Sequence, residues 1–176
     1  MTSALLWDID GTLLSTARAG VFALEEAARE LCGADVDLQA METSGLTDGE
    51  IAALVLRERG QEPTDESVAR FLRAYERHLP DRLGWRQGRV LPGVKPILER
   101  LRERPDVISV LLTGNTPVGA RAKLTHYGLA EHFDAGVFCT DWEDRPSIAR
   151  RAVALVAERS GEDRPPETLI VIGDTP

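Results

Sequence analysis

Two aspartates separated by a single residue, Asp8 and Asp10, stand near the start of the chain and are followed by Gly11 and Thr12. Side chains at alternate positions of an extended strand emerge on the same side, and a glycine lets the backbone turn sharply beside them. Such carboxylates could share a Mg²⁺ ion, which takes hard oxygen ligands and often a substrate phosphate. One carboxylate could then attack phosphorus, while the other protonates the leaving oxygen and later deprotonates a water. The alternative is an ordinary solvated turn, in which Asp-Gly-Thr is common.

Polar residues also follow two later apolar runs. One run ends at Thr113, Gly114 and Asn115, and the last run ends at a glycine and Asp174. In open parallel sheets, ligands bind at the carboxyl ends of the strands. We therefore expect these groups and the two aspartates to lie together at one edge of a sheet.

The strands that would carry these groups alternate with helices along most of the chain. Short apolar runs predict strands, and apolar residues at spacings of three and four predict helices. Strands are expected at 4–7, 107–112, 135–139 and 169–172, and helices at 94–101, 118–128 and 146–158. This alternation predicts a Rossmann-like α/β fold, in which a parallel sheet is covered by helices on both faces and its apolar strands are buried.

A purely helical stretch interrupts this alternation after the first strand. Residues 17–79 show repeated amphipathic helical spacing, and the proline-, glycine- and arginine-rich stretch Pro80–Gly93 is expected to be a connector. We therefore expect a discontinuous α/β core formed by residues 1–14 and 90–176. A small helical unit at residues 15–89 would be inserted into that core.

The composition of the 176-residue chain is that of a soluble globular protein, with 43% hydrophobic and 28% charged residues. Its 29 acidic and 21 basic residues give a formal net charge of -8, the wrong sign for a general binder of nucleic acid. No apolar run approaches the roughly 20 residues needed to cross a bilayer, and no basic leader precedes the first acidic residues. We therefore expect a cytoplasmic protein without a nucleic-acid or membrane partner.

Taken in order, the motifs at residues 8–13, 111–115 and 173–176 resemble those of hydrolases of the haloacid dehalogenase superfamily. The helical insert between the first two motifs is similar to the small cap domain of the phosphoglycolate-phosphatase-like branch. The resemblance covers essentially the whole chain. The later motifs are individually weak, but their order and their placement after strands make the set specific.

The resemblance implies a role for each matching residue. Asp8 would be the nucleophile that becomes a phosphoaspartate, and Asp10 would be the acid and base. Thr113 would hold the transferring phosphoryl group, unless it is simply a threonine that caps the next helix. The other residues expected to bind the substrate at this site are Gly11, Thr12, Gly114 and Asn115. The residues expected to bind Mg²⁺ are Asp8, Asp10 and Asp174.

The family also has a lysine or arginine that neutralises the phosphoryl oxygens, where the charge of this transition state is spread. Arg145 is the expected cation, because it lies in the right interval near the start of a helix. The alternative is a surface arginine that pairs with Glu143 or Asp144. Lys123 is the other candidate cation, but it falls on the preceding helix, one strand early.

The helical insert offers Thr47 and Asp48 just before a predicted helix. They resemble the cap loop that reaches over the catalytic pocket in related phosphatases, where they would touch the substrate; a plain helix cap is the alternative. The family usually has another acidic residue after the position of Asp174, and then a helix, a strand and a final helix. Because this sequence stops at Pro176, we expect the chain to continue beyond it.

The resemblance therefore implies a Mg²⁺-dependent phosphatase that acts on a small phosphorylated metabolite, a phosphate monoester. A phosphomutase of the β-phosphoglucomutase type would share both aspartates and the cap. A 2-haloacid dehalogenase of the same fold would need neither Mg²⁺ nor the second aspartate, so Asp10 argues against it. The remaining alternative is a non-catalytic interaction module. The oligomeric state is left open.

Overall fold

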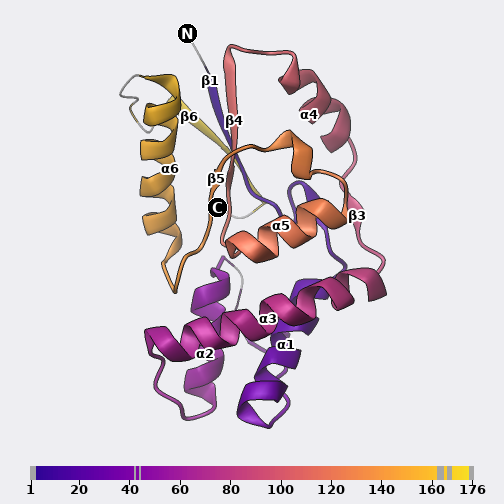
Figure 1. The fold of residues 1–176 in the computed structure, drawn as a ribbon, viewed down its shortest axis with the longest axis vertical. Helices are drawn as coiled ribbons and strands as arrows, with labels where there is room; N and C mark the ends of the chain where they lie inside the picture. Colours follow the sequence, from indigo (N-terminus) through magenta and orange to yellow (C-terminus); the bar gives the residue numbers. More distant parts are fainter. Residues whose placement is uncertain (1–2, 42, 44, 162–164, 166–167, 175–176) are drawn as a thin grey trace.

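The computed structural model of the protein describes residues 3–41, 43, 45–161, 165 and 168–174. Its centre is a parallel sheet with the strand order β5-β4-β1-β6 (Figure 1). The strands are β1 (Ser3–Trp7), β4 (Val107–Leu112), β5 (Gly136–Val137) and β6 (Leu169–Ile172). Leu6 of β1 pairs with Val110 of β4 and with Val171 of β6, so these three neighbouring strands end at the same edge. The parallel α/β fold predicted from the sequence is confirmed.

Helices cover both faces of this sheet. They are α4 (Val94–Arg102), α5 (Pro117–His126), the short 3₁₀ turn η1 (Ala130–His132) and α6 (Arg145–Ser160). Successive side chains of a strand point to opposite faces, so Ala4 and Leu6 share a buried core with α6, whereas Trp7 packs with α4 and α5. Figure 1 shows α6 on one side of the sheet and α4 and α5 on the other. Burial on both faces explains why the β1 and β4 runs are largely apolar.

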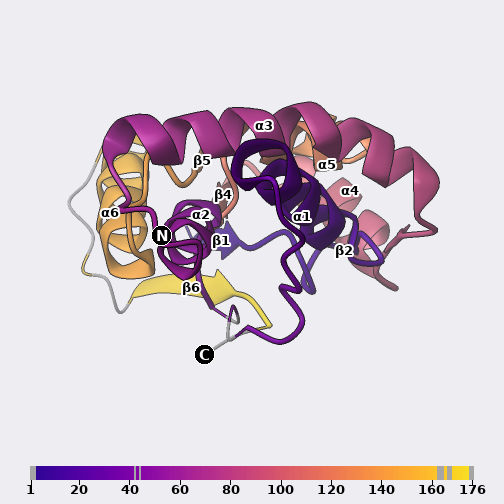
Figure 2. The ribbon, with the colours of Figure 1, turned by 90° about the horizontal axis from the view of Figure 1, so that it is seen from below.

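Three further helices lie beyond the carboxyl ends of the strands (Figures 1 and 2). They are α1 (Ala19–Cys32), α2 (Asp48–Glu58) and α3 (Asp65–Trp85), here called the helical layer. The layer has a buried core of its own, in which Phe71 and Tyr75 of α3 pack among alanines of α1. Thr47 and Thr64 cap α2 and α3, each within a capping box.

The chain crosses between the sheet and the helical layer twice, and the two crossings lie side by side. β2 (Leu14–Ser15) and β3 (Arg89–Val90) form an antiparallel pair, in which Leu14 faces Val90. Gly88 fits this junction because a Cβ there would lie 2.0 Å from the Tyr127 hydroxyl oxygen. The domain boundaries expected from the sequence, between 14 and 15 and between 89 and 90, fall within this strand pair and stay a prediction.

Helix α3 differs from the expectation of a connector that begins at Pro80. The helix continues through Pro80 to Trp85. A proline inside a helix loses one backbone hydrogen bond and usually kinks or ends it, but Leu79 and Leu83 are both buried on the face that packs in the layer. Tertiary burial therefore outweighs the local preference. Neither α3 nor any other described helix is long and apolar enough to cross a membrane.

Strand β6 also differs from the expectation of a buried strand. It lies at the edge of the sheet, and its residues Ile170 and Val171 are 53% and 62% exposed in the described structure. An apolar run on an edge strand is indistinguishable by sequence pattern from one in the middle of a sheet. Strand β5 occupies only two positions of the expected 135–139. Pro176, where the printed sequence stops, lies outside the described residues.

The contact between α2 and the segment after β5 is testable through a pair of helical glycines. A Cβ at Gly49 would lie 2.2 Å from the carbonyl oxygen of Asp141 and 2.6 Å from Cα of Trp142, whereas a Cβ at Gly84 would meet nothing within 4 Å. Gly49→Ala is expected to lower the free energy of unfolding by about 1–3 kcal/mol through overpacking.

Gly84→Ala is the matched control, because the same change in an open helical position should stabilise by about 0.4–1 kcal/mol. Urea denaturation of both variants checks the pair. Equal effects would show that α2 does not pack closely on residues 141–142.

Candidate active site

Asp8 and Asp10 directly follow β1, at the sheet edge that faces the helical layer. The Asp8 amide donates a hydrogen bond to the Ile172 carbonyl (2.9 Å), which extends the strand pairing by one residue. The Asp8 side chain is buried, and its Oδ1 accepts a hydrogen bond from the Ile9 amide (2.8 Å). The Leu13 amide then donates to the Ile9 carbonyl (2.9 Å) and closes the turn. The aspartate pair therefore lies in a hydrogen-bonded turn, and Asp8 is not solvated.

The turn residue Gly11 brings a third carboxylate close. Its φ of 77° lies in the left-handed region, which glycine adopts without strain. A Cβ at Gly11 would lie 2.0 Å from Oδ2 of Asp174, so a side chain at this position would displace that carboxylate. Thr12 is in the same turn, but its buried hydroxyl has no hydrogen-bond partner among the described residues. The ends of β1 and β6 are thereby brought together, as the sequence predicts.

Arg145 supplies a cation beside the first aspartate. It is the first residue of α6, and its Nη1 lies 3.3 Å from Oδ2 of Asp8. Its Nε donates to the Gly45 carbonyl (3.2 Å), which holds the guanidinium at the mouth of the site. The alternative, that Arg145 pairs with Glu143 or Asp144 at the surface, is wrong. Glu143 pairs with Arg151 instead, and Asp144 caps α6. The structure therefore places Arg145 beside Asp8, and its role towards a phosphoryl group stays a prediction.

The loop after β4 is organised by its own side chains. Thr113 is fully buried, and its Oγ1 accepts hydrogen bonds from the Asn115 amide (3.3 Å) and the Asn115 side chain (2.7 Å). The cap of α5 is Thr116, whose Oγ1 accepts from the Gly119 amide (3.0 Å). The alternative that Thr113 caps this helix is therefore wrong.

Lys123, the candidate cation that lies one strand too early for the motif order, is part of the site. It comes from α5, it is only 3% exposed, and its Nζ lies 2.6 Å from Oδ2 of Asp10 and 2.5 Å from Oδ1 of Asn115. Burial lowers the pKa of Lys123, but the carboxylates of Asp10 and Asp48 outweigh it, and the pKa lies above its usual value. One signal was available in the sequence, since Lys123 stands between Ala120 and Leu124 on the apolar stripe of its helix.

Thr47 and Asp48 join the helical layer to the core. Oγ1 of Thr47 accepts from the Glu50 amide as a helix cap and also donates to the Glu143 carbonyl (2.9 Å). The Asp48 amide donates to the Gly114 carbonyl (2.8 Å), and its carboxylate accepts from the Thr116 amide (2.9 Å). The cap alternative is thus correct for Thr47. A contact of either residue with substrate stays a prediction.

The pKa of Asp48 is raised from 3.8 to about 6. Burial is the main cause, because it disfavours the charged carboxylate; the positive charge of Lys123 and the hydrogen bond from the Thr116 amide act in the opposite direction. Two carboxyl groups, Asp48 and Asp10, therefore approach one buried ammonium from the helical layer and from the core.

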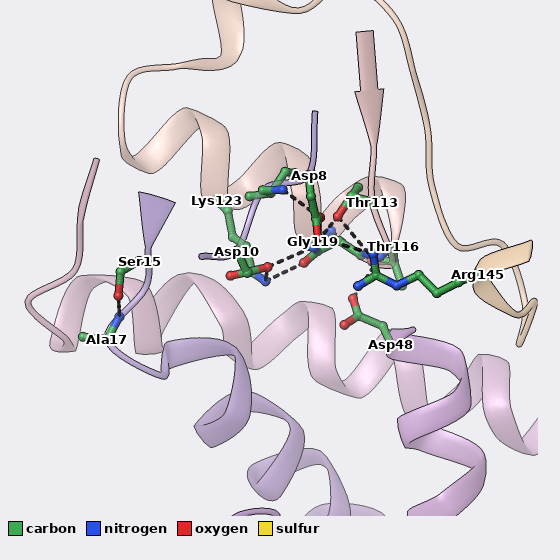
Figure 3. Close-up of polar contacts among 12 residues, drawn as sticks. Asp8, Asp10, Ser15, Ala17, Asp48, Thr113, Thr116, Gly119, Lys123 and Arg145 are labelled. Atoms are coloured by element: carbon green, nitrogen blue, oxygen red, sulfur yellow. Dashed lines mark hydrogen bonds and ion pairs between the residues drawn. The ribbon is translucent and has the colours of Figure 1, made fainter. Parts of the chain in front are cut away.

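A cavity of about 340 Å³ lies between the sheet edge and the helical layer. The predicted residues that line it are Asp8, Asp10, Gly11, Asp48, Gly114, Asn115, Arg145 and Asp174. Thr12, Thr47 and Thr113 are not among the lining residues. Figure 3 shows the charged side chains converging from the two sides, with Asp10 and Lys123 from the core and Asp48 from α2.

The helical layer adds a cavity wall that the sequence motifs do not reveal. Arg18, Val21 and Leu24 line it from the start of α1, and Ile51 and Tyr75 line it from α2 and α3. The amphipathic pattern of these helices predicts which residues are buried. It carries no information about which helix end faces the sheet, because tertiary packing decides that.

Asp8 and Asp174 are the carboxylates that best fit a Mg²⁺ ion. Both line the cavity, and Gly11 leaves room for the Asp174 carboxylate beside the first turn. Mg²⁺ is usually held by one or two carboxylates together with waters and substrate phosphate, so two can suffice. Within the described part of the chain, no three acidic, histidine or cysteine side chains gather as a metal-binding group. Asp10 is hydrogen-bonded to Lys123 and Asn115 instead, and metal binding by the expected set of Asp8, Asp10 and Asp174 stays a prediction.

Comparisons with known proteins identify the family to which this fold belongs. A family model described as haloacid dehalogenase-like hydrolase matches residues 2–176. Because the match spans nearly the whole sequence, the chain belongs to the haloacid dehalogenase-like hydrolases. No match was found among curated proteins.

Solved structures show the same fold. A hydrolase from Pseudomonas syringae is 24% identical, with a TM-score of 0.72 over 99% of this chain and 77% of that chain. CbbY from Rhodobacter sphaeroides, in complex with phosphate, is 21% identical, with a TM-score of 0.74 over 97% and 77% of the two chains. A predicted phosphoglycolate phosphatase from Haemophilus somnus is 16% identical, with a TM-score of 0.63 over 92% and 72%. At these identities, the likeness shows the fold alone.

The raised pKa of Asp48 predicts a pH dependence of stability. The folded state binds more protons than the unfolded state between the unfolded pKa near 3.8 and the folded pKa of about 6. The free energy of unfolding should therefore fall as pH rises through this window, by at most about 3 kcal/mol from this group. Asp48→Asn keeps an acceptor for the Thr116 amide but removes the charge, so its free energy of unfolding should fall less across the window.

Urea denaturation at pH 4 and pH 7 measures this difference, and Asp81→Asn, which removes an exposed carboxylate of α3, is the control. Equal losses of stability in wild type and Asp48→Asn between the two pH values would contradict a pKa of Asp48 that is raised by burial.

Proposed function

We propose that this hydrolase is a Mg²⁺-dependent phosphatase that hydrolyses a small organic phosphate monoester through a phosphoaspartate on Asp8. The observation that carries the proposal is the pairing of a buried Asp8 carboxylate with the Arg145 guanidinium in a cavity that also holds Asp10. A nucleophile, a cation for the phosphoryl oxygens and a second carboxyl group are the parts that this reaction requires.

In the first step, a carboxylate oxygen of Asp8 forms a bond to phosphorus while the bond from phosphorus to the leaving oxygen breaks. Arg145 lies against the same carboxylate, so its guanidinium can reach the oxygens of the transferring phosphoryl group. Charge on these oxygens dominates the transition state. Gly114 and Asn115 line the cavity nearby, on a loop that Thr113 holds in place, and the Gly114 amide would offer a further donor.

Asp10 serves as acid and then as base. It donates a proton to the departing oxygen, which leaves as an alcohol, and its carboxylate then accepts a proton from the water that attacks the phosphoaspartate. The second step releases inorganic phosphate and restores the Asp8 carboxylate. Bound Mg²⁺, held by Asp8 and Asp174, would neutralise phosphate charge.

The size and walls of the cavity support a small substrate. About 340 Å³ between the sheet edge and the helical layer suits a metabolite rather than a polymer. The helical layer would act as a cap that excludes water during the chemistry. The names of two similar structures, CbbY in complex with phosphate and a predicted phosphoglycolate phosphatase, support phosphate chemistry at this site.

Replacement of the nucleophile tests the proposal. Asp8→Asn should lower the turnover of p-nitrophenyl phosphate in Mg²⁺ buffer by at least about a thousandfold, because an amide cannot attack phosphorus. Asp106→Asn removes an exposed carboxylate at the opposite edge of the sheet and should leave turnover unchanged. Circular dichroism and thermal unfolding show whether the variants are folded. Turnover by a folded Asp8→Asn protein would contradict the assignment.

Metal removal is a second test. EDTA should abolish phosphatase activity, and added Mg²⁺ should restore it, because the Asp8 and Asp174 carboxylates would repel the substrate phosphate without a bound cation. Phosphate release is measured in both conditions. Activity that persists without metal, together with chloride release from a 2-chloroacid, would favour the dehalogenase alternative instead.

A further inference from the structure

The ammonium group of Lys123 is buried and donates a hydrogen bond to the second aspartate, Asp10, whereas among the described residues its hydrogen bonds do not include one to Asp8. We propose that Lys123 is a positioning residue for the proton-transfer step: it holds Asp10 so that only one carboxyl oxygen, Oδ1, delivers the proton to the leaving group. This inference rests on the proposed phosphatase function. It assigns a role that the family cation does not fill here, because Arg145 already lies against Asp8.

The hydrogen bonds to Asp10 are concentrated on one oxygen. Oδ2 accepts from Nζ of Lys123 (2.6 Å) and from Nδ2 of Asn115 (2.9 Å). No residue in the described part of the chain donates to Oδ1. An oxygen that already accepts two hydrogen bonds is poorly placed to carry a proton. Oδ1 is therefore the oxygen of Asp10 that is free to take part in proton transfer, and the Asp10 side chain, 42% exposed, remains accessible from the cavity that it lines.

Asn115 connects this arrangement to the phosphoryl site. Its side-chain Oδ1 accepts from Lys123, while its Nδ2 donates both to Asp10 and to Oγ1 of Thr113. Lys123 therefore fixes the amide orientation of Asn115 as well as the rotamer of Asp10. One ammonium group therefore orients both Asp10, which would face the leaving group, and Asn115, which contacts Thr113.

The helical layer closes over Lys123. Gly20 of α1 is so near that a Cβ there would lie 3.5 Å from Nζ, and Asp48 of α2 contributes a second negative charge. The ammonium is thus shielded from solvent, and a charged hydrogen bond in such surroundings is stronger than in water. The hydrogen bond from the shielded Lys123 therefore restricts the conformation of the Asp10 carboxylate.

The step has a simple balance. As Asp8 forms its bond to phosphorus, the bond from phosphorus to the leaving oxygen breaks, and the proton on Oδ1 of Asp10 moves to that oxygen. The leaving group departs as a neutral alcohol, and Asp10 becomes a carboxylate whose charge faces the Lys123 ammonium. Leaving groups of high pKa need this proton, whereas a nitrophenolate departs without it.

The test compares two leaving groups in Lys123→Met, a variant of similar length without charge. Turnover of an alkyl phosphate, the fastest from a small panel for wild type, should fall at least about tenfold more than turnover of p-nitrophenyl phosphate. The KM values should change little. Lys95→Met, a change at an exposed lysine of α4, is the control and should alter neither rate.

The outcomes separate the two proposals. A wild-type chain that hydrolyses neither ester overturns the phosphatase function and this role with it. An active wild type with an equal loss on both esters, no loss, or a change confined to KM in the variant overturns the role of Lys123 alone. If circular dichroism shows that Lys123→Met is unfolded, Lys123→Arg takes its place. Arginine keeps the charge but not the compact ammonium, so the alkyl-to-aryl rate ratio should still fall; an unchanged ratio overturns the role.

Discussion

The candidate site depends on the parallel pairing of three neighbouring strands. β4, β1 and β6 run in the same direction, so their carboxyl ends reach one edge and deliver Thr113, Asp8 and Asp174 to it. A slip of one residue in either pairing would turn these side chains to the wrong face. Burial of β1 on both faces prevents such a slip, because Ala4 and Leu6 fill one core while Trp7 fills the other. The chemistry is thus positioned by hydrophobic packing far from the reacting atoms.

Much of this could be predicted from the sequence because its signals are local. The strand that precedes Asp8, the glycine turn at position 11 and the helix cap at Thr47 each follow from a few neighbouring residues. The resemblance to the family favoured Arg145, and the structure places that residue beside Asp8. The α/β fold and the part of the site around Asp8 could therefore be predicted from the sequence.

The rest depends on which surfaces meet, and neighbouring residues do not record that. Helix α3 passes through Pro80 because Leu79 and Leu83 are buried in the helical layer. The motif order does not favour Lys123, because it follows β4 and not β5. Helix α5, however, lies next to α3 of the helical layer (Figure 1) and directs that side chain into the site. The raised pKa of Asp48 likewise arises from the packing of α2 on the core. Each miss is a case of tertiary contact overriding local pattern.

The short antiparallel pair β2 and β3 has a mechanical consequence. The helical layer is joined to the sheet by two adjacent chain segments, which together form a single hinge line. A body attached along one line can swing about that line without pulling on a second tether. Contacts far along the chain from this line, such as the one from Thr47 to the Glu143 carbonyl, would open first, while the pairing of Leu14 with Val90 is kept. Movement about this line would open the cavity that Asp10 and Lys123 line.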